Sequence, residues 1–158
     1  RFHARHTQPA QKSMKIISNL QQATTQDRLN ALAEQIPYAK FLGMAAEDRD
    51  GIVVTCLPFK TELIGNRNLP AIHGGVLGAF LELTCVIQIM HDSEYAQLPK
   101  TIDIGIEYLR SAGPSDMFAR AYVTRHGRRV ANVRAEMWQH DPGRLITVAH
   151  GHYLLKPL

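Results

Sequence analysis

The longest apolar segment of the chain covers residues 74–90 and contains a single charged side chain, that of Glu82. Apolar residues fall on every side of the helical repeat in this segment, so a helix here must be enclosed by other parts of the protein. The segment is short for a bilayer-spanning helix and has a carboxylate at its centre, which argues against a membrane span. The pattern therefore predicts one long buried helix.

The region before this segment predicts a second helix over residues 13–36, which Pro37 ends. One face of that helix is formed by four apolar residues at the spacing i, i+3, i+4 and i+7, namely Leu29, Leu32, Ala33 and Ile36. Residues 1–12 are polar, rich in histidine and without periodicity, and we expect them to be an irregular or added terminus. Residues 13–158 are expected to form a single domain.

Alternation of apolar and polar residues predicts strands in most of the remaining chain. Residues 41–57 predict a hairpin that turns at residues 48–51, and residues 60–70 predict a loop. Four further strands are predicted at residues 102–108, 117–124, 131–138 and 145–155. The buried face of the first of these should be lined by Ile102, Ile104, Ile106 and Tyr108. In the third, one face should be lined by Ala131, Val133, Ala135 and Met137.

The order of these elements indicates the α+β class. Short connections favour antiparallel neighbours, and the strands are segregated from the helices. The expected architecture is an antiparallel sheet of five to six strands wrapped around one long buried helix, with an additional N-terminal helix.

Composition and charge narrow the range of functions. The 158 residues are 45% hydrophobic and 20% charged, as in an ordinary soluble domain. The net charge of +4 suits a ligand that carries phosphate, but the basic residues are too dispersed to indicate a nucleic-acid partner. Cys56 and Cys85 lack metal-ligand spacing and indicate reduced residues of a cytoplasmic protein. His150 and His152 lack a third ligand, so we expect no metal and no cofactor.

Glu82 and the glycines before it are the candidate chemical groups. Burying an ionised carboxylate is unfavourable without partners, so Glu82 either takes part in chemistry or caps nearby backbone. Gly74 begins the predicted helix, where backbone N–H groups lack intrahelical partners and could bind an oxyanion. Gly75 and Gly78 could extend a bare surface for an acyl chain. Alternatively, these glycines only allow close packing of the helix on a strand.

A set of motifs in a fixed order resembles the hotdog-fold acyl-CoA thioesterases, specifically the phenylacetate-pathway (PaaI-like) branch of the 4-hydroxybenzoyl-CoA thioesterase superfamily. The motifs are His73-Gly74-Gly75, an acid nine residues after the histidine, Thr101-Ile102-Asp103 followed by Tyr108-Leu109-Arg110, and Gly127-Arg128. The resemblance covers residues 36–155. This branch commonly has an amide six residues before the histidine, where this chain has Arg67, so the site amide is Asn66 or Asn68.

The resemblance implies hydrolysis of an acyl-CoA to a free acid and CoA, in the hotdog fold. Glu82 would be the general base or the nucleophile, the Gly74 N–H would be the oxyanion donor, and Asn66 would be the site amide. His73 would support the site and Thr101 would help to position the attacking water. The residues implied in substrate binding are Gly75, Gly78, Asn68, Arg110, Gly127, Arg128 and Arg129. The sequence does not identify the acyl group.

Helix geometry adds an expectation about assembly. Nine residues of helix separate His73 from Glu82 by about 13 Å and by about half a circle. Glu82 could therefore act on a carbonyl held at the Gly74 of a second chain more readily than on one held at its own. The resemblance implies the same shared site, so we expect a homodimer or a homotetramer, with neither nucleic acid nor membrane as a partner. Two alternatives stay open: a hotdog dehydratase or hydratase of 3-hydroxyacyl thioesters, and a non-catalytic acyl-CoA-binding homodimer.

Overall fold

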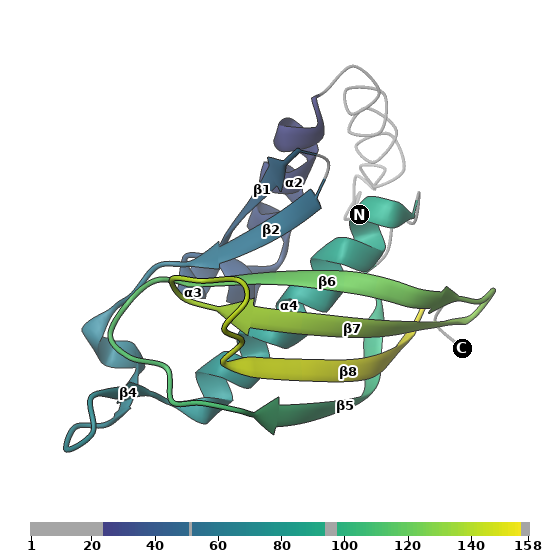
Figure 1. Ribbon diagram of the computed structural model, residues 1–158. Coiled ribbons are helices and arrows are strands. Elements are labelled where there is room, and N and C mark those ends of the chain that lie inside the picture. Colours follow the sequence, from purple (N-terminus) through teal and green to yellow (C-terminus); the bar gives the residue numbers. More distant parts are fainter. Residues whose placement is uncertain (1–23, 51, 94–97, 156–158) are drawn as a thin grey trace, which may run out of the picture.

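Six strands form one antiparallel sheet in the order β1-β2-β6-β7-β8-β5, and α4 lies against one face of it (Figure 1). The computed structural model describes residues 24–50, 52–93 and 98–155. The strands of this sheet are β1 (Ala45–Arg49), β2 (Ile52–Leu57), β5 (Lys100–Tyr108), β6 (Met117–His126), β7 (Val130–Trp138) and β8 (Thr147–Leu154). The other elements are α2 (Thr25–Gln35), α3 (Pro37–Leu42), the 3-10 helix η1 (Thr61–Leu63), α4 (Gly74–Asp92), and the hairpin of β3 (Ile64–Asn66) and β4 (Ala71–Ile72). The predicted α+β class and antiparallel sheet are confirmed.

Helix α4 is the core helix of the domain. It packs against β2, β5, β6, β7 and β8, and its buried residues are Leu77, Gly78, Phe80, Leu81, Thr84, Cys85, Val86, Ile87 and Ile89. The one buried polar side chain among these, Thr84, bonds Thr55 of β2 at 2.7 Å. α4 has the length and the apolar composition of a membrane-spanning helix. Its packing against the sheet explains that composition, because a core helix needs the same apolar surface.

One stripe of α4 is left partly uncovered by the single chain. It is formed by Gly75, Val76, Ala79, Glu82, Leu83 and Met90, which are half-buried or exposed. These positions fall on one side of the helical repeat. The sheet covers the opposite side only, so Glu82 is half-buried here although its neighbours toward the sheet are fully enclosed.

The N-terminal segment begins with a capping box. The Thr24 hydroxyl accepts from the Asp27 N–H at 3.2 Å, and the Asp27 carboxylate accepts from the Thr24 N–H at 3.1 Å. Leu29 and Ala33 face the core, as the periodicity predicted. The predicted helix is confirmed from residue 25 to residue 35, whereas residues 1–12 and 13–23 lie outside the described residues. Pro37 ends it as predicted and also occupies the first turn of a further helix, α3.

Two other features differ from the sequence prediction. The segment predicted as a loop, residues 60–70, contains η1 and β3, and β3 pairs with β4 directly after that segment. In β5, Ile104 and Ile106 pack against the core, but Ile102 and Tyr108 are 55% and 54% exposed. A register shift between Thr101 and Asp103 interrupts the alternation, and β5 lies at the edge of the sheet. By contrast, the predicted inward face of β7 is confirmed, with Ala131, Val133, Ala135 and Met137 all buried.

Candidate functional site

His73 caps the start of α4. Its backbone is extended (φ −63°, ψ 131°), and its Nδ1 accepts a hydrogen bond of 2.9 Å from the Gly75 N–H. Because a backbone N–H is the donor, Nδ1 carries no proton and the Nε2 of a neutral ring carries it. Gly65 of β3 packs so closely that a Cβ there would lie 2.7 Å from the Cβ of His73. His73 therefore lies between the β3–β4 hairpin and the start of α4.

The Gly74 N–H is the open donor at this helix start. The N–H groups of Val76 and Leu77 bond the His73 carbonyl, and that of Gly75 bonds the His73 ring. Within the described part of the chain, no acceptor is bonded to the Gly74 N–H. The positive end of the helix dipole and an unpaired N–H coincide at this place, and together they favour binding of an anionic oxygen.

Strand β5 packs tightly on the first two turns of α4. The Tyr108 hydroxyl donates to the Gly74 carbonyl at 2.9 Å, and a Cβ on Gly74 would lie 3.3 Å from the Tyr108 ring. A Cβ on Gly78 would lie 2.7 Å from Cδ1 of Ile106. Gly78 is therefore covered by its own chain, and close packing accounts for it, whereas Gly75 is exposed. Alternation marked Tyr108 as an apolar position and the resemblance placed it in a motif, but neither predicted its contact with Gly74.

Glu82 and Thr101 meet on the uncovered side of α4. The Thr101 hydroxyl donates to Oε1 of Glu82 at 2.5 Å. One turn further along α4, Cys85 is fully buried, and burial raises the pKa of its thiol to about 12. Burial likewise raises the pKa of the Tyr153 hydroxyl on β8. Neither of these two groups ionises near neutral pH.

The two halves of the predicted site lie at opposite ends of β5. Thr101 pairs with Tyr153 at one end of β8, and Tyr108 pairs with Thr147 at the other. Along α4, eight residues separate Gly74 from Glu82, which corresponds to about 12 Å. A single chain therefore brings Thr101 to Glu82 and Tyr108 to Gly74, but it does not bring Glu82 to Gly74.

Both candidate amides lie at the tip of the β3–β4 hairpin, which projects from the body of the domain (Figure 1). Oδ1 of Asn66 accepts from the N–H groups of Asn68 and Leu69 at 3.0 and 3.4 Å and so closes the turn. Asn66 and Asn68 are both exposed. Their hairpin directly precedes the start of α4 at Gly74, so they lie near that end of the helix and not beside Glu82.

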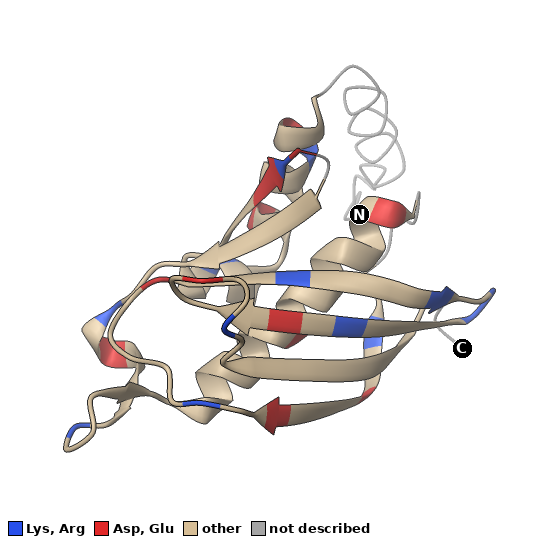
Figure 2. Cartoon of the chain, in the orientation of Figure 1, with Lys and Arg blue, Asp and Glu red and all other residues tan. Residues whose placement is uncertain are grey.

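The predicted arginines are divided between the two ends of the sheet. Arg110 follows β5, whereas Arg128 and Arg129 form the β6–β7 turn, where basic residues gather at the far tip (Figure 2). Gly127 suits this turn because a Cβ there would lie 2.9 Å from the Val130 carbonyl oxygen, to which its own N–H donates. One chain therefore does not form a single cationic rim from Arg110, Arg128 and Arg129.

The two histidines of β8 have other neighbours. Nδ1 of His152 lies 2.9 Å from the Asp103 carboxylate, and the His150 ring covers Gly105. Among the residues that the structure describes, no cluster of three or more His, Cys, Asp and Glu side chains could hold a metal ion.

The chain matches one protein-family model. A model described as the thioesterase superfamily matches residues 69–146, which include the start of α4, Glu82 and Thr101. A protein of Chromobacterium violaceum is 32% identical over 94% of this chain and 98% of its own, with a TM-score of 0.68. The chain belongs to the thioesterase superfamily. A comparison with curated proteins found no match.

Other solved structures share the hotdog fold of this thioesterase-superfamily protein. A protein of Ralstonia eutropha described as phenylacetic acid degradation-related is 23% identical, with a TM-score of 0.68, over 80% of this chain and 98% of that chain. Thioesterase superfamily member 2 of Mus musculus is 14% identical, with a TM-score of 0.69, over 85% of this chain and 98% of that chain. At these identities the likeness concerns the fold, a six-stranded antiparallel sheet on a long central helix with a further N-terminal helix.

Proposed function

We propose that the protein hydrolyses an acyl-CoA thioester to the free acid and CoA. The observation that carries the proposal is the hydrogen bond from Thr101 to Glu82 on the uncovered stripe of α4. Membership of the thioesterase superfamily and the open Gly74 N–H support it. The order of the motifs from His73 to Arg128 favours the PaaI-like branch, and the similar Ralstonia eutropha protein is described as phenylacetic acid degradation-related.

In this reaction the Gly74 N–H would bind the thioester oxygen and stabilise the negative charge that develops on it. Thr101 occupies Oε1 of Glu82 and leaves Oε2 for a water molecule or for direct attack on the carbonyl carbon. With Glu82 as base, the water oxygen bonds to the carbonyl carbon, the C–S bond breaks, and the proton that Glu82 takes from the water passes to the CoA sulfur. With Glu82 as nucleophile, its oxygen forms an anhydride with the acyl group as the C–S bond breaks, and water then hydrolyses the anhydride to the free acid while its proton goes to the CoA thiolate. Both descriptions of Glu82, as base and as nucleophile, fit this arrangement.

We further propose that two chains share each site. β5 is an edge strand of nine residues that carries the exposed apolar side chains Ile102 and Tyr108. Such an edge favours pairing with another strand. Antiparallel pairing of β5 with its own copy about a twofold axis would bring the Tyr108 end of one chain to the Thr101 end of the other. Gly74 would then face the partner subunit's Glu82, and the uncovered stripe of α4 would be enclosed.

The same pairing would reunite the divided arginines. Arg110 of one chain would lie at the end of the dimer where the β6–β7 turn of the other chain carries Arg128 and Arg129. Guanidinium groups from two chains could then contact the phosphates of one CoA. The homodimer is thus part of the proposed mechanism, and a tetramer would be two such dimers.

The dehydratase and hydratase alternatives need a histidine that faces the substrate. Nδ1 of His73 is occupied by the Gly75 N–H, which favours a supporting role for this ring over proton transfer. A panel of short-chain, medium-chain and phenylacetyl-CoA thioesters, with detection of the released thiol, tests the proposal. We expect thiol release from at least one of them. Water addition to an enoyl-CoA, or binding of acyl-CoA with no thiol release from any thioester, would contradict hydrolysis.

A further inference from the structure

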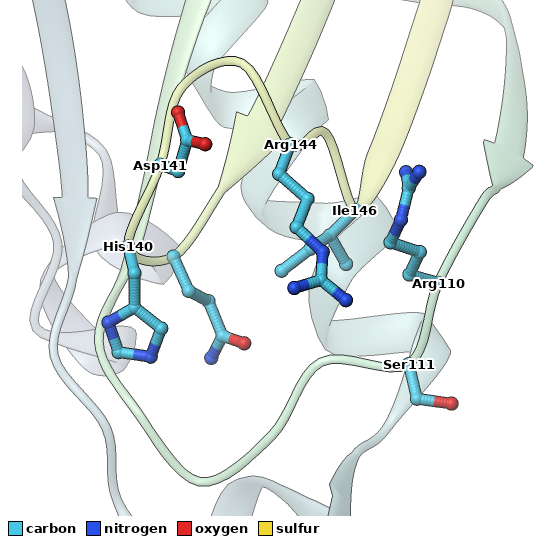
Figure 3. Close-up of a pocket in the computed structure, with 7 residues that line it drawn as sticks. Arg110, Ser111, His140, Asp141, Arg144 and Ile146 are labelled. Atoms are coloured by element: carbon cyan, nitrogen blue, oxygen red, sulfur yellow. The ribbon is translucent and has the colours of Figure 1, made fainter.

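A cavity with a basic lining lies at the end of the sheet where β5 stops. It has a volume of about 530 Å³ and is formed by the segment after β5 and the connection between β7 and β8 (Figure 3). Its lining residues are Arg110, Ser111, Gln139, His140, Asp141, Arg144 and Ile146. The volume is within the usual range of small-molecule sites.

The walls of this cavity are held by hydrogen bonds of the chain itself. The Gln139 amide donates to the carbonyls of Gly113 and Ser115 at 2.8 and 3.0 Å and accepts from the Gly113 N–H at 3.1 Å. Arg110 donates from Nη1 to the Leu145 carbonyl at 2.5 Å. These bonds tie the two segments together, so the cavity is formed before any ligand arrives.

The two guanidinium groups of the cavity carry uncompensated charge. Within the described ranges, no carboxylate lies at ion-pair distance from Arg110 or Arg144. The carboxylate of Asp141 accepts from the Gly143 N–H at 2.8 Å, and Figure 3 shows it turned away from the Arg144 guanidinium. Both guanidinium groups line the cavity, and guanidinium groups without a carboxylate partner are suited to phosphate oxygens.

The basic cavity adjoins the start of α4. A neighbouring cavity of about 390 Å³ is lined by Gly74, Leu77 and Tyr108, and the two cavities share Arg110 and Ser111. A molecule whose thioester lay at the Gly74 N–H could therefore extend past Arg110 into the basic cavity without crossing the sheet.

We propose that the cavity between Arg110 and Arg144 binds phosphate groups of the CoA portion of the substrate, with His140 and Ser111 as further polar contacts. The inference rests on the proposed function for the identity of the ligand. It adds Arg144 and His140, which come from the β7–β8 connection, to the residues that bind substrate. Within one chain the β6–β7 turn lies at the other end of the sheet, so in the proposed dimer Arg144 would join the arginines that two chains bring to one CoA.

Calorimetric titration with CoA tests the inference apart from catalysis. We expect Arg144→Ala to weaken CoA binding at least tenfold and Arg144→Lys to weaken it less. The matched control is Arg28→Ala, which removes an exposed arginine of α2 and should leave the affinity unchanged. Titration with dephospho-CoA and with pantetheine identifies the group concerned. The effect of Arg144→Ala should be absent for pantetheine, and it should persist with dephospho-CoA if the diphosphate is bound and vanish if the 3′-phosphate is bound.

Equal CoA affinity of Arg144→Ala and the wild type would overturn the inference, as would an equal loss of affinity for pantetheine. A wild type that hydrolyses acyl-CoA while Arg144→Ala keeps its KM would refute the cavity and leave the proposed function standing. A wild type that binds CoA through Arg144 but releases no thiol from any acyl-CoA would support the cavity and refute hydrolysis.

Discussion

The Thr101 hydroxyl donates a 2.5 Å hydrogen bond to Oε1 of Glu82 and so joins the start of the edge strand β5 to the middle of α4. The two residues are 19 positions apart, and both are half-buried on a side of the helix that the chain leaves uncovered. A carboxylate held at one oxygen keeps a fixed orientation while its other oxygen stays available.

Replacement of the Glu82 carboxylate should lower turnover strongly while preserving the fold. We expect Glu82→Gln to lower kcat about 10²–10⁴-fold, as for loss of a general base or nucleophile. The control is Glu107→Gln, which removes an exposed carboxylate of β5. Thiol release from the best acyl-CoA is the measurement, and activity of Glu82→Gln near that of the control would refute the assignment.

Removal of the Thr101 hydroxyl should lower kcat more than it changes KM. A hydrogen bond to a charged group contributes about 1.5–3 kcal/mol, so Thr101→Val should reduce kcat about ten- to hundredfold. Thr101→Ser keeps the hydroxyl and should recover most of the rate. Steady-state kinetics of both variants decide the matter. An equally large decrease of kcat in Thr101→Ser would indicate that the rate depends on packing of the strand and not on the hydroxyl.

The Gly74 N–H can be deleted with little change to the helix. Proline suits the first position of a helix, and the extended backbone of His73 tolerates a following proline. We expect Gly74→Pro to lower kcat about 10²–10³-fold, as for loss of one oxyanion donor. Gly74→Ala is the matched variant, because it adds the same Cβ against Tyr108 but keeps the N–H. Equal rates for the two variants would argue against an oxyanion role.

The close contact between the hairpin and the helix start should be visible in stability. A Cβ on Gly65 would lie 2.8 Å from Cα of His73, which is backbone and cannot move aside alone. Gly65→Ala should therefore lower the free energy of unfolding by about 1–3 kcal/mol in urea titrations. Gly113→Ala is the control, since a Cβ there meets nothing within 4 Å. Equal free energies of unfolding for the two variants would show that the close contact between Gly65 and His73 does not contribute to stability.

Long periodic segments made most of the fold predictable, whereas short or edge segments did not. The apolar run of α4 and the inward alternation of β7 are confirmed because burial on the sheet side determines which residues fit. The helix α3 and the β3–β4 hairpin have too few residues to give a periodic signal. Ile102 and Tyr108 lie on an edge strand with a register shift, so the core does not fix their side.

The candidate site was predictable only where motifs bring residues together along the chain. Gly74 and Glu82 follow from the start and the composition of one helix, whereas the resemblance supplied His73 and Thr101. The basic cavity escaped prediction because Arg110 and Arg144 come from two connections, and hydrogen bonds of Gln139 and Arg110 bring these together. The spacing of residues along the sequence does not predict such contacts.

The central claim is that each site takes Gly74 from one chain and Glu82 from the other, and mixing two inactive variants tests it most directly. Glu82→Gln and Gly74→Pro chains should each be nearly inactive alone. After subunit exchange at equal concentrations, about half of the dimers should be mixed, and each mixed dimer would have one intact site. The account predicts recovery of about a quarter of wild-type thiol release, whereas no recovery after exchange verified by native mass spectrometry would contradict it.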